Sequence, residues 1–134
     1  MRRVAQAIRL SVEAEAEYIR FHERVWPEVL ATIAACNIAN YSIFLRKGVL
    51  FAYFEYHGAD YEADMLRMAA CPHMQRWWAI TDPMQAPMAD AEPGEKWSPM
   101  REVFHFDSVK QSAAPPRKPN SRVLGTAVPS ERAD

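Results

Sequence analysis

The sequence predicts an α+β domain in which a four-stranded antiparallel sheet carries its helices on one face. Three observations lead to this fold class. Apolar residues alternate with a period of two in four segments, which is typical of half-buried strands. Between the first and second segments, and between the third and fourth, they recur with helical spacing. The second and third segments are separated by only a short turn, as in a hairpin.

The first part of the chain is expected to form a strand followed by two helices. Residues 4–10 alternate so that one face carries Val4, Gln6, Ile8 and Leu10. Ser11 can cap the next helix, whose first turns hold acidic residues that suit the positive end of a helix dipole, namely Glu13, Glu15 and Glu17. Because proline lacks a backbone N–H, Pro27 predicts a break at Trp26 and a second helix from residue 27 to about residue 36.

Two β-rich segments, residues 41–46 and 50–56, follow and are joined across Lys47 and Gly48. Glycine allows a tight turn, so they should form an antiparallel hairpin. Apolar side chains point to both faces of this hairpin, with Tyr41, Ile43 and Leu45 opposite Phe44. Helices can cover only one face. The other face is therefore expected to pack on a second subunit, giving a twofold dimer of α/β-barrel type.

The rest of the domain, from residue 61 onward, is expected to add two helices, a long loop and a last strand. Residues 61–70 should form a helix, and Pro72 restarts the chain into another helix over residues 73–80. Residues 81–97 contain three prolines and a glycine, and are expected to form a long loop of functional or mobile character. Residues 100–106 are expected to form the final strand. The order strand, helices, strand, strand, helices, strand is that of the ferredoxin-like, split βαβ fold.

Composition limits the class of protein. The 134 residues suit one domain, with 25% charged and 49% hydrophobic residues. A net charge of −1 gives no electrostatic case for binding nucleic acid or an anionic membrane. The start of the chain is too short and mixed for a secretory signal, and no apolar run approaches the roughly 20 residues of a spanning helix. With two cysteines suited to remain reduced, the protein is expected in the cytoplasm.

The domain is expected to cover residues 1–107 and to end where the composition changes. Residues 108–134 contain no Phe, Tyr or Trp, hold four of the ten prolines and carry a net charge of +3. Such a segment cannot bury enough apolar surface to offset the entropy of ordering it. We therefore expect a flexible, proline-rich basic tail. The alternative, a partner-binding arm, has no motif to support it.

Tyr18, His22 and Trp26 are spaced four residues apart, so the first two should lie together on one helical face. A histidine in this position could act as a partly buried general acid or base, beside a tyrosine hydroxyl that positions a substrate. The alternative is a helix histidine without function, hydrogen-bonded to a nearby carboxylate or water. Spacing does not decide between the two.

The adjacent residues Trp77 and Trp78 form the second unusual feature. Neighbouring side chains on a helix point about 100° apart, so the two indoles cannot face the same point in the core. At least one should line a cavity or an interface, where its flat ring suits the C–H surface of a sugar. Core and dimer packing is the equally open alternative.

The other candidates are weaker. Cys71 and His73 suggest a metal, but no second ligand pair has suitable spacing, so no metal site is expected. His105 is more readily structural, and His57 is expected to be solvated. Asp82 and Glu102 could each orient a substrate hydroxyl, or serve as a helix cap or a surface charge. The sequence has no glycine-rich phosphate loop, nucleophile elbow or zincin helix, so no cofactor is expected either.

Five short motifs, taken together and in order, resemble those of the L-rhamnose mutarotase family. They are Tyr18-xxx-His22-xxx-Trp26-Pro27-Glu28, Asn40-Tyr41-Ser42-Ile43, Gln75-Arg76-Trp77-Trp78, Thr81-Asp82-x-Met84 and Glu102-Val103-Phe104-His105. They span nearly all of residues 3–107 and agree with the ferredoxin-like fold. Each motif is weak alone, but five in this order are fairly specific.

The resemblance implies a dimeric, cofactor-free isomerase of the aldose 1-epimerase type, which interconverts the α and β anomers of a 6-deoxy-L-hexose. It implies that His22 is the proton donor and that the sugar is bound by Tyr18, Tyr41, Trp77 and Trp78. The segment after Met84 departs from the family's usual Asn-Pro-Asp-Asn-Ser-Pro type of loop. This departure bears on the choice of sugar, so L-fucose is considered beside L-rhamnose.

Two other functions remain open at this point. One is a non-catalytic sugar-binding module in which the tryptophan pair binds the ligand and His22 is idle. The other is a small dimeric oxygenase or haem-binding protein, which rests on analogy of fold alone. Exchange between sugar anomers would separate the mutarotase from both.

Overall fold

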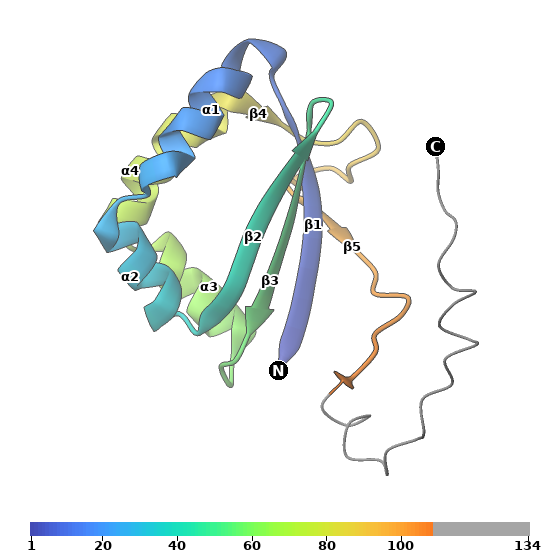
Figure 1. Cartoon of the computed structure of the whole chain (residues 1–134). Helices are drawn as coiled ribbons and strands as arrows, with labels where there is room; N and C mark the ends of the chain where they lie inside the picture. Colours follow the sequence, from blue (N-terminus) through green and yellow to red (C-terminus); the bar gives the residue numbers. More distant parts are fainter. Residues whose placement is uncertain (109–134) are drawn as a thin grey trace, which may run out of the picture. The chain divides into compact units, whose positions relative to one another are not determined.

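The computed structural model describes residues 1–108, and the elements discussed here belong to its compact unit, Met1–Glu102. The strands are β1 (Arg2–Leu10), β2 (Ile38–Arg46), β3 (Val49–Tyr56), β4 (Gln85–Ala86) and β5 (Ser98–Met100). The helices are α1 (Glu15–Phe21), α2 (Pro27–Ala35), α3 (Tyr61–Ala69) and α4 (Pro72–Thr81). Short 3₁₀ turns are formed by Val12–Ala14, His22–Arg24 and Asp82–Met84. The helices lie together on one side of a curled antiparallel sheet (Figure 1), so the predicted α+β, ferredoxin-like class is confirmed.

The sheet has the strand order β2-β3-β1-β4, with β5 also paired to β1. Its centre is the long β1–β3 ladder, which runs from the pair Arg2↔Tyr56 to the pair Arg9↔Val49. On the other edge of β1, Ala86 pairs with Arg9, whereas Ser98 pairs with Ala7. The fourth strand is therefore one strand in two pieces, and residues 87–97 leave the sheet between them.

The predicted break at Trp26 is confirmed, because α2 begins at Pro27 with Trp26 in an extended conformation. The predicted capping role of Ser11 is wrong. Its hydroxyl donates to a carboxylate oxygen of Glu13 (2.9 Å) rather than accepting from a backbone N–H. A 3₁₀ turn consequently precedes α1, and a second one follows it, so the first helix is shorter than predicted.

The final strand was predicted at residues 100–106, and this is wrong. The strand is Ser98–Met100, and residues 101–107 form no strand. The register explains the difference, because β5 pairs antiparallel to β1 with Met100 opposite Ala5. Because β1 starts at Arg2, a ladder continued in this register would end at residue 103, so the apolar alternation beyond that residue has no partner in β1. Most of the predicted tail, residues 109–134, lies outside the described residues.

Two separate apolar clusters lie between the sheet and the helices. The first, here called the α2/α4 cluster, consists of Val29, Cys36, Ile38, Phe54, Met68, Met74 and Trp77. The second, here called the α1 cluster, consists of Ile8, Leu10, Tyr18, Leu50 and Met84. Alternate residues of β1 join them, since Val4 packs on the first and Ile8 belongs to the second. The helix-facing side of the sheet thus carries one cluster toward each end.

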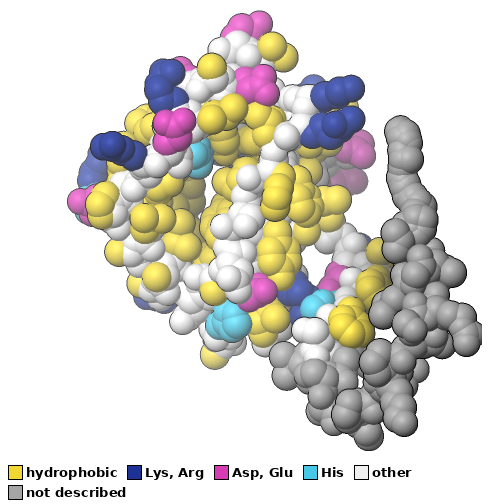
Figure 2. Space-filling view, in the orientation of Figure 1, with side chains coloured by type: hydrophobic (Ala, Val, Ile, Leu, Met, Phe, Trp, Pro, Cys, Tyr) yellow, Lys and Arg dark blue, Asp and Glu magenta, His cyan; other side chains and the backbone are white. Residues whose placement is uncertain are grey.

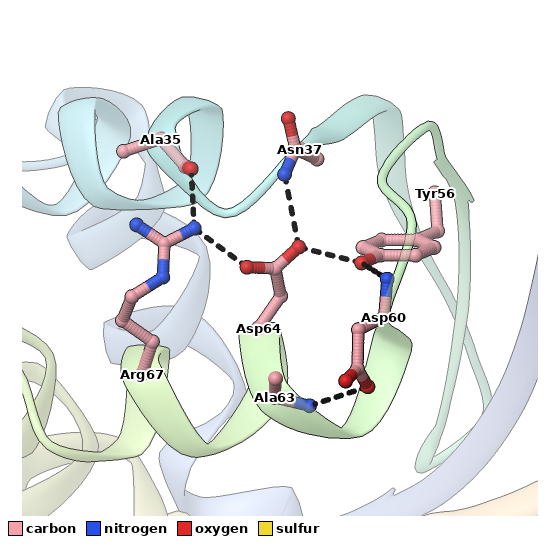
Figure 3. Close-up of polar contacts among 7 residues, drawn as sticks. All are labelled: Ala35, Asn37, Tyr56, Asp60, Ala63, Asp64 and Arg67. Carbon is pink, nitrogen blue, oxygen red and sulfur yellow. Dashed lines mark hydrogen bonds and ion pairs between the residues drawn. The ribbon is translucent and has the colours of Figure 1, made fainter.

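A polar network fastens the end of the hairpin to α3 (Figure 3). The Tyr56 hydroxyl donates to Asp64 Oδ2 (2.5 Å), and the Asn37 amide donates to the same oxygen (2.9 Å). Arg67 donates both to Asp64 Oδ1 (2.6 Å) and to the carbonyl of Ala35 (2.8 Å). These contacts, the Tyr56 hydrogen bond first, lower the pKa of Asp64 to about 2.

The same network excludes larger residues at Gly58. A Cβ atom there would lie 2.3 Å from the Tyr56 hydroxyl oxygen, so the turn after β3 requires glycine for space. Asp60 then begins α3 by accepting a hydrogen bond from the backbone N–H of Ala63 (3.1 Å) (Figure 3). The carboxyl end of β3 and the start of α3 are therefore held together as one rigid corner.

Candidate active site

Tyr18 and His22 lie against each other, as their spacing predicts. Tyr18 comes from the last turns of α1 and is 5% exposed, and His22 is the residue that caps this helix. Their ring centroids are 4.2 Å apart, with the planes tilted by 31°. The His22 ring nitrogen Nδ1 lies 2.8 Å from the carbonyl oxygen of Tyr18. The 3₁₀ turn at His22 and the preceding helix therefore fix the imidazole against its own backbone.

This contact determines which nitrogen of His22 can exchange a proton. A carbonyl oxygen only accepts hydrogen bonds, so Nδ1 carries the hydrogen and donates it to Tyr18. The ring nitrogen that this hydrogen bond leaves available for proton exchange is therefore Nε2. Burial is the main influence on the ring and lowers the pKa of His22, while the backbone hydrogen bond works in the opposite direction. At neutral pH the imidazole is accordingly uncharged, with a lone pair on Nε2.

Trp77 is the second aromatic residue that contacts the imidazole ring of His22. It is 5% exposed and meets His22 edge to face, with ring centroids 5.3 Å apart. Phe21 stacks on the same indole at 3.9 Å, and Trp26 meets it edge to face at 5.1 Å. Trp78 points elsewhere, is half-buried and packs against the α2/α4 cluster. The two indoles thus have different surroundings, and Trp77 is the one in contact with His22.

Tyr41 reaches the site from the sheet through an irregularity in β2. The β2–β3 register shifts by one residue between Ala39 and Ser42, and Asn40 has a positive φ of 51°. Asparagine tolerates this left-handed conformation, and such a bulge redirects the neighbouring side chain. Tyr41 thereby packs over Phe54, on the helix-facing side, with ring centroids 5.3 Å apart. Although its ring is partly exposed, burial of the hydroxyl raises the pKa of Tyr41.

The hydroxyls of Tyr18 and Tyr41 lie close enough for Tyr41 to influence the ionisation of Tyr18. Burial raises the pKa of Tyr18 to about 12, and the nearby Tyr41 hydroxyl adds to this effect. The Gln85 amide on β4 donates to the Tyr18 hydroxyl at 3.5 Å, a long hydrogen bond. Both phenols therefore stay protonated at working pH. Gln85 was missed by sequence analysis, because it lies in the segment predicted as a loop and its partner is 67 residues away.

Other polar residues considered from the sequence have their own partners. Lys96 pairs with Asp82, Arg3 pairs with Glu102 at 2.9 Å, and His57 lies 3.3 Å from Glu55. His105 belongs to the second unit, which begins at Val103. Within residues 1–108 no group of three or more His, Cys, Asp or Glu side chains is placed to hold a metal ion. None of the helices in this part of the chain is long and apolar enough to cross a membrane.

The resulting site lies between the helical layer and the hairpin, where the surface is hollowed and largely hydrophobic side chains form the walls (Figure 2). A neutral imidazole nitrogen and two protonated phenols can exchange or share protons with the hydroxyls of a small ligand. A separate open depression is lined by Arg9 and residues of the 87–96 segment, and it contains none of the predicted site residues. The geometry therefore favours acid–base chemistry on a small, neutral, polar molecule.

Comparison with known proteins agrees with this chemistry. A family model described as "L-rhamnose mutarotase" matches residues 3–106. The L-rhamnose mutarotase of Opitutus terrae is 36% identical over 108 residues, which cover 78% of this chain and 99% of the relative. The L-fucose mutarotase of Xanthomonas campestris is 35% identical over 106 residues, covering 74% of this chain and 84% of the relative.

Solved structures show the same fold. A crystal structure of the L-rhamnose mutarotase FA22100 from Formosa agariphila superimposes with a TM-score of 0.64 at 22% identity, covering 80% of this chain and all of that one. The tetracenomycin F2 cyclase of Streptomyces glaucescens, a polyketide cyclase, superimposes with a TM-score of 0.54 at 12% identity, covering 80% and 98% of the two chains. At these identities the likeness concerns the fold alone.

Proposed function

The chain belongs to the L-rhamnose mutarotase family, and we propose that it is a mutarotase that interconverts the α and β anomers of a 6-deoxy-L-hexose. The observation that carries this proposal is the fixed, uncharged imidazole of His22, with Nδ1 engaged by the Tyr18 carbonyl and Nε2 left for the substrate. L-Rhamnose and L-fucose are the substrates to test, because relatives are named for each.

Mutarotation needs one proton to leave the anomeric hydroxyl and one to reach the ring oxygen. Both oxygens are bonded to the same carbon, so one nitrogen can serve them in turn. Nε2 of His22 takes the proton from the anomeric hydroxyl, and the imidazolium then donates it to the ring oxygen as the bond from this oxygen to C1 breaks. The open aldehyde turns about its C1–C2 bond, and the reverse steps close the ring on the other carbonyl face. His22 is thus the proton donor for ring opening.

The tyrosines and tryptophans would bind the sugar. The phenols of Tyr18 and Tyr41 stay protonated and can donate to sugar oxygens, including the one that gains charge as the ring opens. Aromatic faces suit the C–H surface and the methyl group of a 6-deoxy sugar. Trp78, half-buried, offers more surface to a ligand, whereas the buried Trp77 acts largely by holding His22.

We also propose that two copies pair through the sheet face that the helices leave uncovered. A row of small and apolar residues crosses this face, because Ala7 pairs with Phe51 and Phe51 with Phe44. Phe44 is 59% exposed and lies beside Phe51, with ring centroids 6.0 Å apart. An apolar row that ends in an exposed phenylalanine is typical of an isologous interface. The free thiols of Cys36 and Cys71 suit the reducing cytoplasm, where we place the protein.

Magnetisation transfer between the anomer signals in NMR tests the catalytic proposal. L-Rhamnose and L-fucose are equilibrated with wild-type protein, with His22→Ala and with buffer alone. Wild type should accelerate exchange of at least one sugar, and His22→Ala should lose about 10²- to 10⁴-fold of this acceleration, the usual size of acid–base catalysis. If wild type exchanges neither sugar faster than buffer but its tryptophan fluorescence responds to them, the chain is a binding module and the catalytic proposal is wrong.

A further inference from the structure

A polar side chain lies in the middle of the helix-facing side of the sheet. Gln6 on β1 stands directly opposite Ala52 on β3, which is fully buried, and directly opposed residues project from the same face. The neighbours of Gln6 on this face of β1 are Val4 and Ile8. Val4 packs on the α2/α4 cluster and Ile8 belongs to the α1 cluster, so Gln6 lies between the two clusters on this strand. Gln6 therefore marks the place where the two clusters are separated.

The amide of Gln6 is not used by the fold. The side chain is half-buried, yet it forms no hydrogen bond with the protein within residues 1–108. A polar group that is partly removed from water without a partner costs free energy, and an apolar residue here would join the clusters on either side. The choice of glutamine is therefore unfavourable for stability, which is typical of a residue kept for binding.

His22 occupies the corresponding position in the helical layer. Its ring contacts Tyr18 of the α1 cluster on one side and Trp77 of the α2/α4 cluster on the other. His22 from the helices and Gln6 from the sheet thus both lie where the two clusters meet. Ala52, opposite Gln6 on β3, carries only a methyl side chain and is fully buried, so Gln6 is the larger side chain at this point of the sheet. Gln6 is thus the polar side chain that the sheet presents toward the layer that holds His22.

We propose that Gln6 binds a ring hydroxyl of the substrate and helps to determine which sugar is accepted. A carboxamide both donates and accepts hydrogen bonds, and so does a sugar hydroxyl, so the two groups match. Of the groups that surround the site, the phenols and the imidazole lie on the helices and on the bulged edge strand. Gln6 is the polar group that the central strand contributes. The inference rests on the proposed function, since it names a further contact of the same site.

The test replaces the amide without changing the shape of the side chain. Gln6→Met keeps the length and removes both hydrogen-bonding atoms. Loss of one neutral hydrogen bond should raise KM, and the Kd measured by tryptophan fluorescence, about three- to tenfold, with a smaller change in kcat. The Tm should stay the same or rise, because a partly desolvated amide is replaced by an apolar group. Gln75→Met is the matched control, since this exposed amide already donates to the carbonyl of Ala69.

Deoxy analogues of L-rhamnose and L-fucose, each lacking one ring hydroxyl at C2, C3 or C4, identify the partner. Wild type should bind one analogue three- to tenfold more weakly than the parent sugar, and Gln6→Met should bind that analogue and the parent equally. The inference is wrong if Gln6→Met binds every sugar as wild type does, or if it loses several degrees of Tm and weakens all sugars alike. Because Kd is measured without turnover, this result is independent of whether anomer exchange is accelerated.

Discussion

The Nδ1 atom of His22 donates a hydrogen bond to the main-chain carbonyl of Tyr18, one helical turn earlier, at 2.8 Å. This bond fixes both the tautomer and the orientation of the ring, so that Nε2 alone can meet a substrate. The phenol of Tyr18, tilted against the imidazole, and the perpendicular indole of Trp77 prevent the ring from turning away. The catalytic proposal therefore depends on main-chain geometry as much as on the histidine itself.

The first prediction concerns pH. Burial lowers the pKa of His22 below its ordinary value of about 6.5, and the mechanism starts from the uncharged ring. Enzymatic exchange, after subtraction of the buffer rate, should therefore be constant near pH 7 and fall only as the pH drops below that lowered pKa. Measurement of kcat/KM from pH 4.5 to 8 checks this. A rate that rises as His22 becomes protonated would contradict the uncharged starting state.

The second prediction concerns the bulge that aims Tyr41. Asn40 has a φ of 51°, which glycine adopts readily and a β-branched residue does not. Asn40→Gly should keep KM for the sugar within about threefold, whereas Asn40→Val should raise it by about tenfold or more, because Tyr41 would turn away from the site. Both variants lose the hydrogen bond from Asn40 to Glu55, so the pair isolates the backbone effect. Equal KM values for the two variants would show that the bulge does not matter.

The third prediction concerns acid stability. The folded-state pKa of Asp64 is about 2, below the ordinary value of about 3.9 for the unfolded chain. Its contribution to the free energy of unfolding is therefore fully present above about pH 4 and is lost as the pH falls toward 2. Asp64→Asn should lower the Tm at pH 7, and its difference from wild type should shrink between pH 4 and 2. Glu62→Gln, on the exposed side of α3, is the control and should behave as wild type throughout.

The fourth prediction concerns the uncovered sheet face. Phe44→Glu places a charge in the apolar row formed with Phe51, and should convert the proposed dimer into a monomer in light scattering coupled to gel filtration. Leu66→Glu is the matched control, because Leu66 is 72% exposed on α3, in the helical layer. A wild-type monomer, or dissociation by the control but not by Phe44→Glu, would show that the proposed interface is wrong.

Local sequence signals predicted the parts of the fold that local chemistry decides. Pro27 marked the start of α2, and the Lys47-Gly48 pair marked the hairpin turn, since each constrains its own backbone. The two-part fourth strand was not predictable in this way. Ala86 and Ser98 owe their strand conformation to β1, far away in the chain, and within residues 1–108 the alternation in residues 101–106 has no partner strand.

In the candidate site, too, local sequence predicted only the contacts that local spacing decides. The contact between Tyr18 and His22 follows from helical spacing, and it was predicted. Whether Trp77 or Trp78 meets His22 depends on how α4 packs against α1, which spacing cannot show. The inward turn of Tyr41 depends on a bulge at Asn40, and no pattern in the sequence marks it. Gln6 was noted only as one of four residues on a strand face, because its isolation between the clusters is a tertiary property.

The most direct test of the proposed mechanism is the anomer exchange rate of L-rhamnose and L-fucose in the presence of wild type and of His22→Gln, with folding checked by Tm. Glutamine keeps a hydrogen-bonding side chain near the Tyr18 carbonyl but cannot carry a proton between two oxygens. The mechanism predicts accelerated exchange with wild type, loss of at least a hundredfold of that acceleration with the variant, and retained sugar binding. Unchanged acceleration with folded His22→Gln would contradict it.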